Sequence, residues 1–207
     1  MSKVYDGIVI SRIKVVDMGN GIVEFGNNSP AGEKARFLKD VTKTGSADTF
    51  TATEIDYSEA KRVINLNGAI GADTTPLFCV HGFNFQPSDV LEDIEEVRER
   101  FEKGGHYYPV PIMWPCSDGN ALLNYDKDQE GFSQDSGALF EKLVEQIPDD
   151  TFPRKSLLIH SMGNHVVFNG SCGAESAPQV QFENIFMVAA VSMTNTTSDG
   201  HTSHFSF

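Results

Sequence analysis

Residues 156–169 read SLLIHSMGNHVVFN, and this stretch decides the fold of the chain. Residues 156–159 predict a short buried strand, and residues 164–169 begin a helix. Ser161 therefore lies in a sharp turn from a strand into a helix, where helix amide groups point at its hydroxyl. The Met162 amide is placed to hold a developing oxyanion, and Gly163 lets the helix pack close to the strand. We predict a nucleophile at Ser161.

A second strand supports this interpretation of the serine. Residues 77–80 are apolar and run directly into His81-Gly82-Phe83-Asn84. Gly82 allows the backbone to approach a substrate closely, and the Phe83 amide is the expected second oxyanion donor. Against the interpretation, Ile159 stands where the usual G-x-S-x-G pattern has its first glycine, and a serine in such a turn can also be a plain helix cap.

Three motifs taken together resemble a known family. They are VHGFN at residues 80–84, MWPC at 113–116 and IHSMGN at 159–164. In this order they resemble α/β-hydrolases of an esterase/lipase-like group of largely unknown function, over about residues 76–190. The resemblance implies a serine nucleophile at Ser161, an oxyanion hole from the Phe83 and Met162 amides, and a carboxylic ester or related acyl compound as substrate.

The order of the elements predicts an α/β fold. Strands alternate with helices, which implies crossover connections between parallel strands. We expect one domain, a three-layer α/β/α sandwich around a mostly parallel, α/β-hydrolase-like sheet whose C-terminal strands are missing. Residues 1–70 are its β-rich N-terminal segment, 76–191 its hydrolase core and 192–207 a flexible tail. The predicted strands are 8–16, 50–54, 77–80, 110–114, 156–159 and 185–191, and the predicted helices are 88–103, capped by Ser88 or Asp89, 134–146 and 164–169.

The catalytic base has to come from the end of the chain if the usual triad order of Ser, acid and His holds. Only 16 residues follow Val191, too few for two further strands with their helices. Three explanations stay open. The chain is truncated or frame-altered near residue 190; or its tail folds back and offers His204 or His201 as base, with Asp199 to orient it; or base and acid come from elsewhere or from another subunit.

The remaining candidates surround the nucleophile. His81 is expected to shape the oxyanion loop and to contact substrate, while Trp114 and Tyr125 are expected to line an acyl pocket, with core packing as the alternative for Trp114. His160 should face away from Ser161, because adjacent strand residues point to opposite faces. The acidic residues near position 126 lack further ligands at fixed spacing, so we expect no metal and no cofactor.

Composition narrows the partners. Acidic residues outnumber basic ones by 29 to 16, and the formal charge of −13 repels phosphate backbones, which argues against nucleic acid. No window approaches 18 apolar residues, so no membrane span is expected. Three cysteines without metal-ligand spacing favour free thiols in a reducing compartment and, with no secretory leader, a cytoplasmic protein. An exposed edge strand is expected to pair with a second copy, giving a homodimer.

The expected function is hydrolysis of a small-molecule carboxylic ester by a serine esterase. A competing hypothesis is a hydrolase-fold binding or scaffold protein without catalysis, which Ile159 and the short tail favour. A third is an acyltransferase or thioesterase that uses the same strand-to-helix turn.

Overall fold

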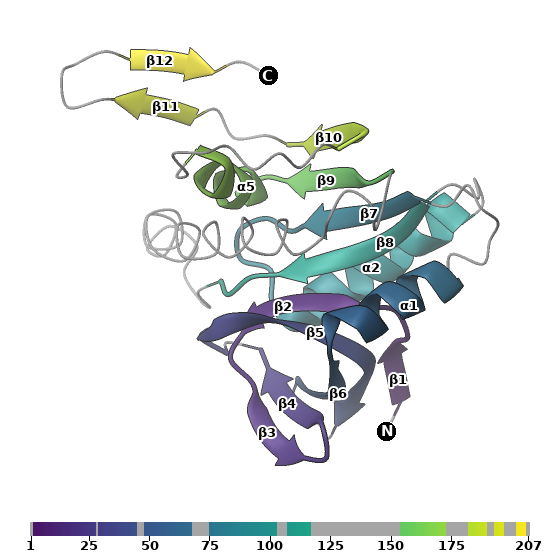
Figure 1. Ribbon diagram of the computed structural model, residues 1–207. Coiled ribbons are helices and arrows are strands. Elements are labelled where there is room, and N and C mark those ends of the chain that lie inside the picture. The colour runs from purple at the N-terminus through teal and green to yellow at the C-terminus, as the bar shows by residue number, and fades with distance from the viewer. Residues whose placement is uncertain are drawn as a thin grey trace.

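A ten-stranded mixed sheet organises the chain (Figure 1). The computed structural model describes residues 2–27, 29–44, 48–67, 75–102, 107–116, 154–172, 182–189, 193–196 and 202–205. The strands follow the order β10-β9-β7-β8-β2-β5-β6-β4-β3, and β1 pairs with β5 outside this path. The predicted helix at 134–146 lies outside the described residues.

The half of the sheet that carries the three motifs is parallel. It contains β7 (Thr75–Val80), β8 (Tyr107–Met113), β9 (Ser156–His160) and β10 (Asn184–Val188). β8 lies between β7 and β2, while β9 joins the opposite side of β7. The carboxyl ends of β7, β8 and β9 consequently meet at one edge, which brings His81, Trp114 and Ser161 into one region.

The N-terminal half of the sheet is antiparallel. Its strands are β1 (Ser2–Tyr5), β2 (Val9–Ile13), β3 (Val16–Gly19), β4 (Ile22–Gly26), β5 (Ala31–Thr44) and β6 (Thr49–Ile55). The predicted strand at 8–16 is thus two strands, because the exposed β3 turns away to pair with β4. The expectation of a mostly parallel sheet holds from β10 to β2. The rest is antiparallel, through the hairpins β3–β4 and β5–β6 and through pairs of strands that are not consecutive in the chain.

Two apolar clusters form the core, and alternation along the strands assigns residues to them. Ile8 and Ile10 belong to the first cluster, with residues of α1 (Tyr57–Asn67) and α5 (Gly163–Cys172). Val9 belongs to the second cluster, with Val90, Leu91 and Ile94 of α2 (Pro87–Glu102). In Figure 1, α1 and α5 lie in front of the sheet and α2 lies behind it.

The start of α2 differs in one detail from the predicted cap. Asp89 does cap the helix, since its carboxylate accepts a hydrogen bond from the Gln86 amide at 2.8 Å. Ser88 does not. Its own amide donates to the Asn27 side-chain oxygen at 3.2 Å, so a residue distant in sequence satisfies this helix end. Pro87 at the first helical position has no amide hydrogen to satisfy.

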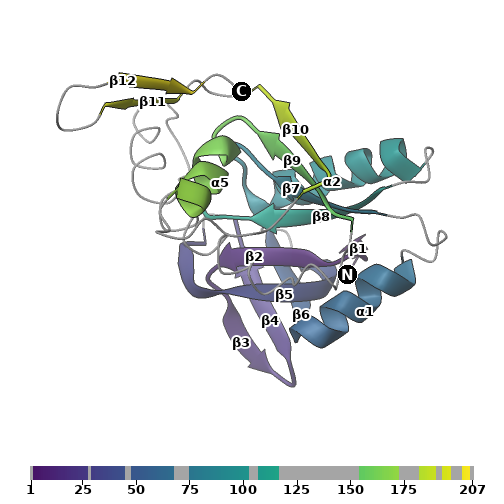
Figure 2. The same ribbon diagram turned by 45° about the horizontal axis from the view of Figure 1, so that its top comes forward.

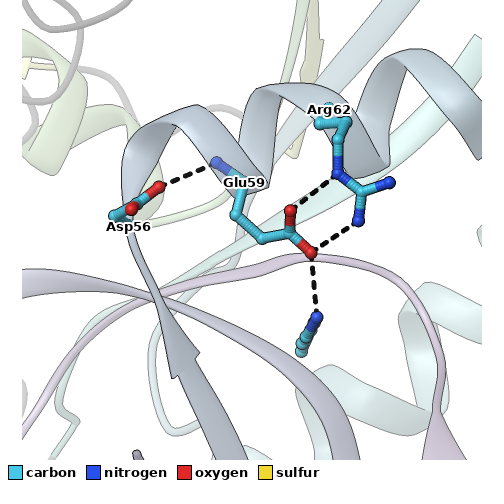
Figure 3. A network of polar contacts seen from close by, with 4 residues as sticks. Asp56, Glu59 and Arg62 are labelled. Atoms are coloured by element: carbon cyan, nitrogen blue, oxygen red, sulfur yellow. Dashed lines mark hydrogen bonds and ion pairs between the residues drawn. The ribbon is translucent and has the colours of Figure 1, made fainter.

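Helix α1 was not expected from the sequence, and a local polar network holds it in place (Figure 3). The Asp56 carboxylate accepts from the Glu59 amide at 2.8 Å, which caps the first turn. The Glu59 carboxylate in turn accepts from Arg62 at 2.7 Å and from Lys39 of β5 at 3.0 Å. Hydrogen bonds from these two cations lower the pKa of Glu59 to about 2, which keeps it charged and ties α1 to the sheet.

Beyond β10 the chain forms a separate two-stranded sheet from β11 (Met193–Thr196) and β12 (Thr202–Phe205). Its residues belong to the segment predicted to be a flexible tail. None of the helices in the described part of the chain is long and apolar enough to cross a membrane.

Candidate active site

Ser161 occupies a strained turn between β9 and α5. β9 ends at His160 and α5 begins at Gly163, so two residues make the change of direction. Ser161 has a φ of +49°, a left-handed conformation that non-glycine residues adopt at a cost of about 1–2 kcal/mol. Its amide donates to the Val188 carbonyl at the end of β10, at 2.9 Å. Such backbone strain clusters at functional sites and gives the serine hydroxyl its exposed position in nucleophile elbows.

Asn164 stabilises this turn from the helix side. Its side-chain amide donates to the Ser161 carbonyl at 2.6 Å, and its backbone amide donates to the same oxygen at 3.1 Å. Asn164 is 5% exposed, so these bonds form largely away from water. Asn164 belongs to the IHSMGN motif, but its role could not be predicted from the sequence, because a side chain that bonds back to a strained residue three positions earlier has no distinctive spacing.

Two glycines allow the oxyanion loop and the elbow to approach each other. A Cβ placed on Gly163 would lie 2.7 Å from the His81 carbonyl oxygen and 2.9 Å from that of Val80. A Cβ on Gly82 would lie 2.9 Å from Cβ of Ser161 and 2.9 Å from Nδ1 of His160. Contacts this short do not occur, so only glycine fits at either position. The loop that carries the Phe83 amide therefore adjoins the Ser161 turn.

The Met162 side chain is fully buried beneath this turn, and its carbonyl accepts from the His165 amide at 2.9 Å. Phe83 is half-buried and packs against the first core cluster. The Met162 amide follows Ser161 directly, and the Phe83 amide belongs to the loop that adjoins the Ser161 turn. Their use as oxyanion donors stays a prediction.

His81 connects the first motif to the second. Its Nε2 accepts from the Trp114 amide at 3.1 Å, so its Nδ1 carries the hydrogen and donates to the Gly82 carbonyl at 2.8 Å. The Trp114 indole donates to the His81 carbonyl at 2.9 Å, and the two rings stack with centroids 5.1 Å apart. Trp114 is 1% exposed and lies in the core. These bonds explain why His-Gly and Trp-Pro occur together: each holds the other in place.

Burial makes His81 a neutral residue. Loss of hydration is the main cause that lowers the pKa of its imidazole, from 6.5 to about 4, and the proximity of His160 acts in the same direction. Both nitrogens of the neutral His81 imidazole are hydrogen-bonded, Nε2 to the Trp114 amide and Nδ1 to the Gly82 carbonyl, so neither is free to accept a serine proton. His81 therefore positions the loop.

The depressed pKa of His81 predicts a pH-dependent stability. In the unfolded chain His81 binds a proton below pH 6.5, and in the folded chain only below about pH 4. The unfolded state binds more protons in this window, so the free energy of unfolding should fall by about 3 kcal/mol as the pH drops through it. Denaturant titrations from pH 7 to pH 5 measure the slope, before most carboxylates titrate.

His81→Asn removes the titrating group and should flatten this slope. His165→Asn is the matched control: the pKa of His165 is also lowered by burial, but less, so most of the slope should remain. A wild-type stability that does not change between pH 7 and pH 5 would show that His81 is hydrated in the folded protein.

The other described histidines make contacts elsewhere. Among the described residues, no imidazole hydrogen-bonds to Ser161. His160 lies on β9 and its ring meets Phe85 edge-on at 5.6 Å, in line with its expected structural role. His165 is buried in the first turn of α5, where its Nε2 has no partner within the described chain. His204 lies on β12 opposite Thr194. His201, Asp199 and Tyr125 lie outside the described residues.

Metal-ligating side chains do not gather anywhere in the described ranges: no three of His, Cys, Asp or Glu come close enough to hold an ion. Neither Cys79 nor Cys116 forms a disulfide. Burial raises the pKa of Cys79 to about 12, so it stays protonated and unreactive at neutral pH. Among the described residues, this region therefore holds neither a metal cluster nor an ionised Cys79 thiol.

Comparison with protein families matches residues 58–189 to one described as an alpha/beta hydrolase of unknown function (DUF900). The match begins in α1 and ends one residue beyond β10, so it contains the elbow, the oxyanion loop and the Trp-Pro motif. No curated protein and no solved structure matches the chain.

Proposed function

The chain belongs to this family of alpha/beta hydrolases, and on that premise we propose that it hydrolyses carboxylic esters with Ser161 as nucleophile. The observation that carries the proposal is the left-handed Ser161, held by Val188 on one side and Asn164 on the other. A plain helix cap needs no such strain, because cap residues normally have β-region backbone angles. The strain supports a nucleophile more than a cap.

The proposed reaction has two steps. The Ser161 hydroxyl attacks the ester carbonyl, its proton passes to a base, and the negative oxygen that develops is held by the Met162 and Phe83 amides. The carbon–oxygen bond to the alcohol then breaks, the alcohol leaves with the proton, and an acyl-serine remains. Water attacks this acyl group with the help of the same base and releases the acid. His204 or His201, oriented by Asp199, is the proposed base.

The rest of the proposed site follows the same plan. The substrate side is formed by His81, Trp114 and Tyr125. His81 and Trp114 contribute by fixing the oxyanion loop from beneath.

The arrangement of α2 with one core cluster and of α1 and α5 with the other supports a three-layer sandwich. The absence of a disulfide at Cys79 and Cys116 supports a cytoplasmic protein. The exposed apolar residues of β10, at the sheet edge, support a homodimer.

A fluorophosphonate probe tests the proposal directly. Such probes label a serine only when its hydroxyl is activated, so mass spectrometry of the labelled protein should place the adduct on Ser161. Ser161→Ala should not be labelled. Preincubation with a short-chain ester should slow labelling of the wild type.

A binding module without catalysis is the second candidate, and the described histidines favour it, since none hydrogen-bonds to Ser161. The same probe separates the two candidates. A folded protein whose Ser161 stays unlabelled after prolonged exposure supports the binding module and removes the esterase proposal.

A further inference from the structure

A small apolar groove lies beside the elbow, between α2 and the sheet. Its volume is about 220 Å³. Val90, Ile94 and Val97 of α2 form one wall, and Leu158, His160 and Val188 of β9 and β10 form the other. Helix α2 packs mainly against β8, and Figure 2 shows it on the sheet near β7 and β8. Small-molecule sites of about 300–1,000 Å³ suit drug-sized ligands, so this volume suits a smaller ligand.

The groove adjoins the proposed ester site and shares His81 with it. Ser161 does not line the groove, but the His160 ring does. A Cβ added to Gly82 would lie 2.9 Å from Nδ1 of His160 and 2.9 Å from Cβ of Ser161, so the His160 ring lies next to the elbow. A ligand in the groove would therefore contact the back of the elbow.

Aromatic rings close the end of the groove near the elbow. Phe85 lines it, 5.6 Å from the His160 ring and 6.0 Å from the His81 ring, measured between centroids. Because the face of a phenylalanine ring carries partial negative charge, it attracts cations that lack a full hydration shell. Aliphatic walls and an aromatic end together suit an apolar group that carries a positive charge.

One carboxylate lies at the solvent-exposed rim of this groove. Asp93 of α2 lines the groove, and neither Lys nor Arg does. Burial is the main cause that raises the pKa of Asp93, and the negative charges of Glu96 and Asp89 raise it further. His160 opposes this shift only weakly. The other titratable groups that line the groove, Cys79 and His81, are neutral at pH 7. A bound cation would therefore give Asp93 a counter-ion that no Lys or Arg lining the groove supplies.

We propose that this groove binds a small lipophilic cation, an organic ammonium whose hydrocarbon part lies between α2 and β9 while its charge pairs with Asp93. A carboxylate ligand is disfavoured because its charge would meet Asp93, Asp89 and Glu96. A neutral alkane or alcohol would fill the same space but leave Asp93 without a counter-ion.

Three probes of matched length test the charge preference: n-hexylamine, which is protonated at neutral pH, n-hexanol and n-hexanoate. Methyl NMR of the full chain reads out binding, since Val90, Ile94, Val97 and Val188 line the groove. Hexylamine should shift these methyl signals saturably and bind about tenfold more tightly than hexanol. Hexanoate should bind more weakly than hexanol. The methyl signals of Val15 and Val23, far along the sheet, should not move.

Asp93→Asn should remove most of the preference for hexylamine over hexanol and leave hexanol binding unchanged. Glu99→Gln is the matched control, because it removes an exposed carboxylate of α2 that does not line the groove. Equal binding of hexylamine and hexanol by the wild type, or no saturable shift with hexylamine, overturns the proposal. Methyl shifts of Val90, Ile94 and Val97 on α2 that change with protein concentration alone also overturn it, since they assign the groove, and not only the exposed β10 edge, to a second copy of the chain. Ser161 labelling plays no part in these outcomes.

Discussion

Ser161→Ala should lower turnover of short-chain nitrophenyl esters by about 10³-fold or more, because no other group in the proposed mechanism can form the acyl intermediate. The loss should appear in kcat, since removal of one hydroxyl leaves the substrate pocket intact. The strained backbone at Ser161 imposes the same cost on alanine, so thermal unfolding should change little. Release of nitrophenolate under steady-state conditions measures the effect.

Ser58→Ala is the matched control for this loss. Ser58 is an exposed serine of α1, and the same exchange there should leave turnover unchanged. If the Ser161 variant retains wild-type turnover, Ser161 has no role in the chemistry and any esterase activity comes from another group.

Gly163→Ala should destabilise the protein by about 2–3 kcal/mol, as expected for overpacking in a well-packed interior. The added methyl group would lie 2.7 Å from the His81 carbonyl oxygen and 2.9 Å from the Val80 carbonyl oxygen. Both are backbone atoms, so the clash can be relieved only if β7 and α5 move apart. For a chain of this size the melting temperature should fall by about 5–10 °C.

The same movement should slow fluorophosphonate labelling, since it separates the oxyanion loop from Ser161. Gly19→Ala is a useful comparison. Gly19 has a φ of +88° and nothing within 4 Å of the added carbon, so only backbone strain of about 1 kcal/mol should appear there. An unchanged melting temperature for Gly163→Ala would contradict the close packing of α5 on β7.

Much of the hydrolase half could be predicted from the sequence because its elements have strong local patterns. The apolar runs before His81 and Ser161 gave β7 and β9 nearly to the residue, and the acidic amphipathic repeat gave α2. Helix α1 was missed, because its cap Asp56 follows a strand without a turn signal and its polar face depends on Lys39 from another strand. The contribution of Asn27 to the start of α2, in place of Ser88, was missed for the same reason, because Asn27 lies 61 residues away in the sequence.

At the candidate site, the sequence by itself determined the family, the serine turn and the loop that faces it, since each depends on residues that are adjacent in the chain. Only the tertiary structure decided how these parts support one another. The His81–Trp114 bonds, the contact of Gly163 with β7 and the Val188 carbonyl on Ser161 join residues that are distant in sequence. Sheet order brings them together, and sheet order depends on which buried surfaces fit, which no local pattern encodes.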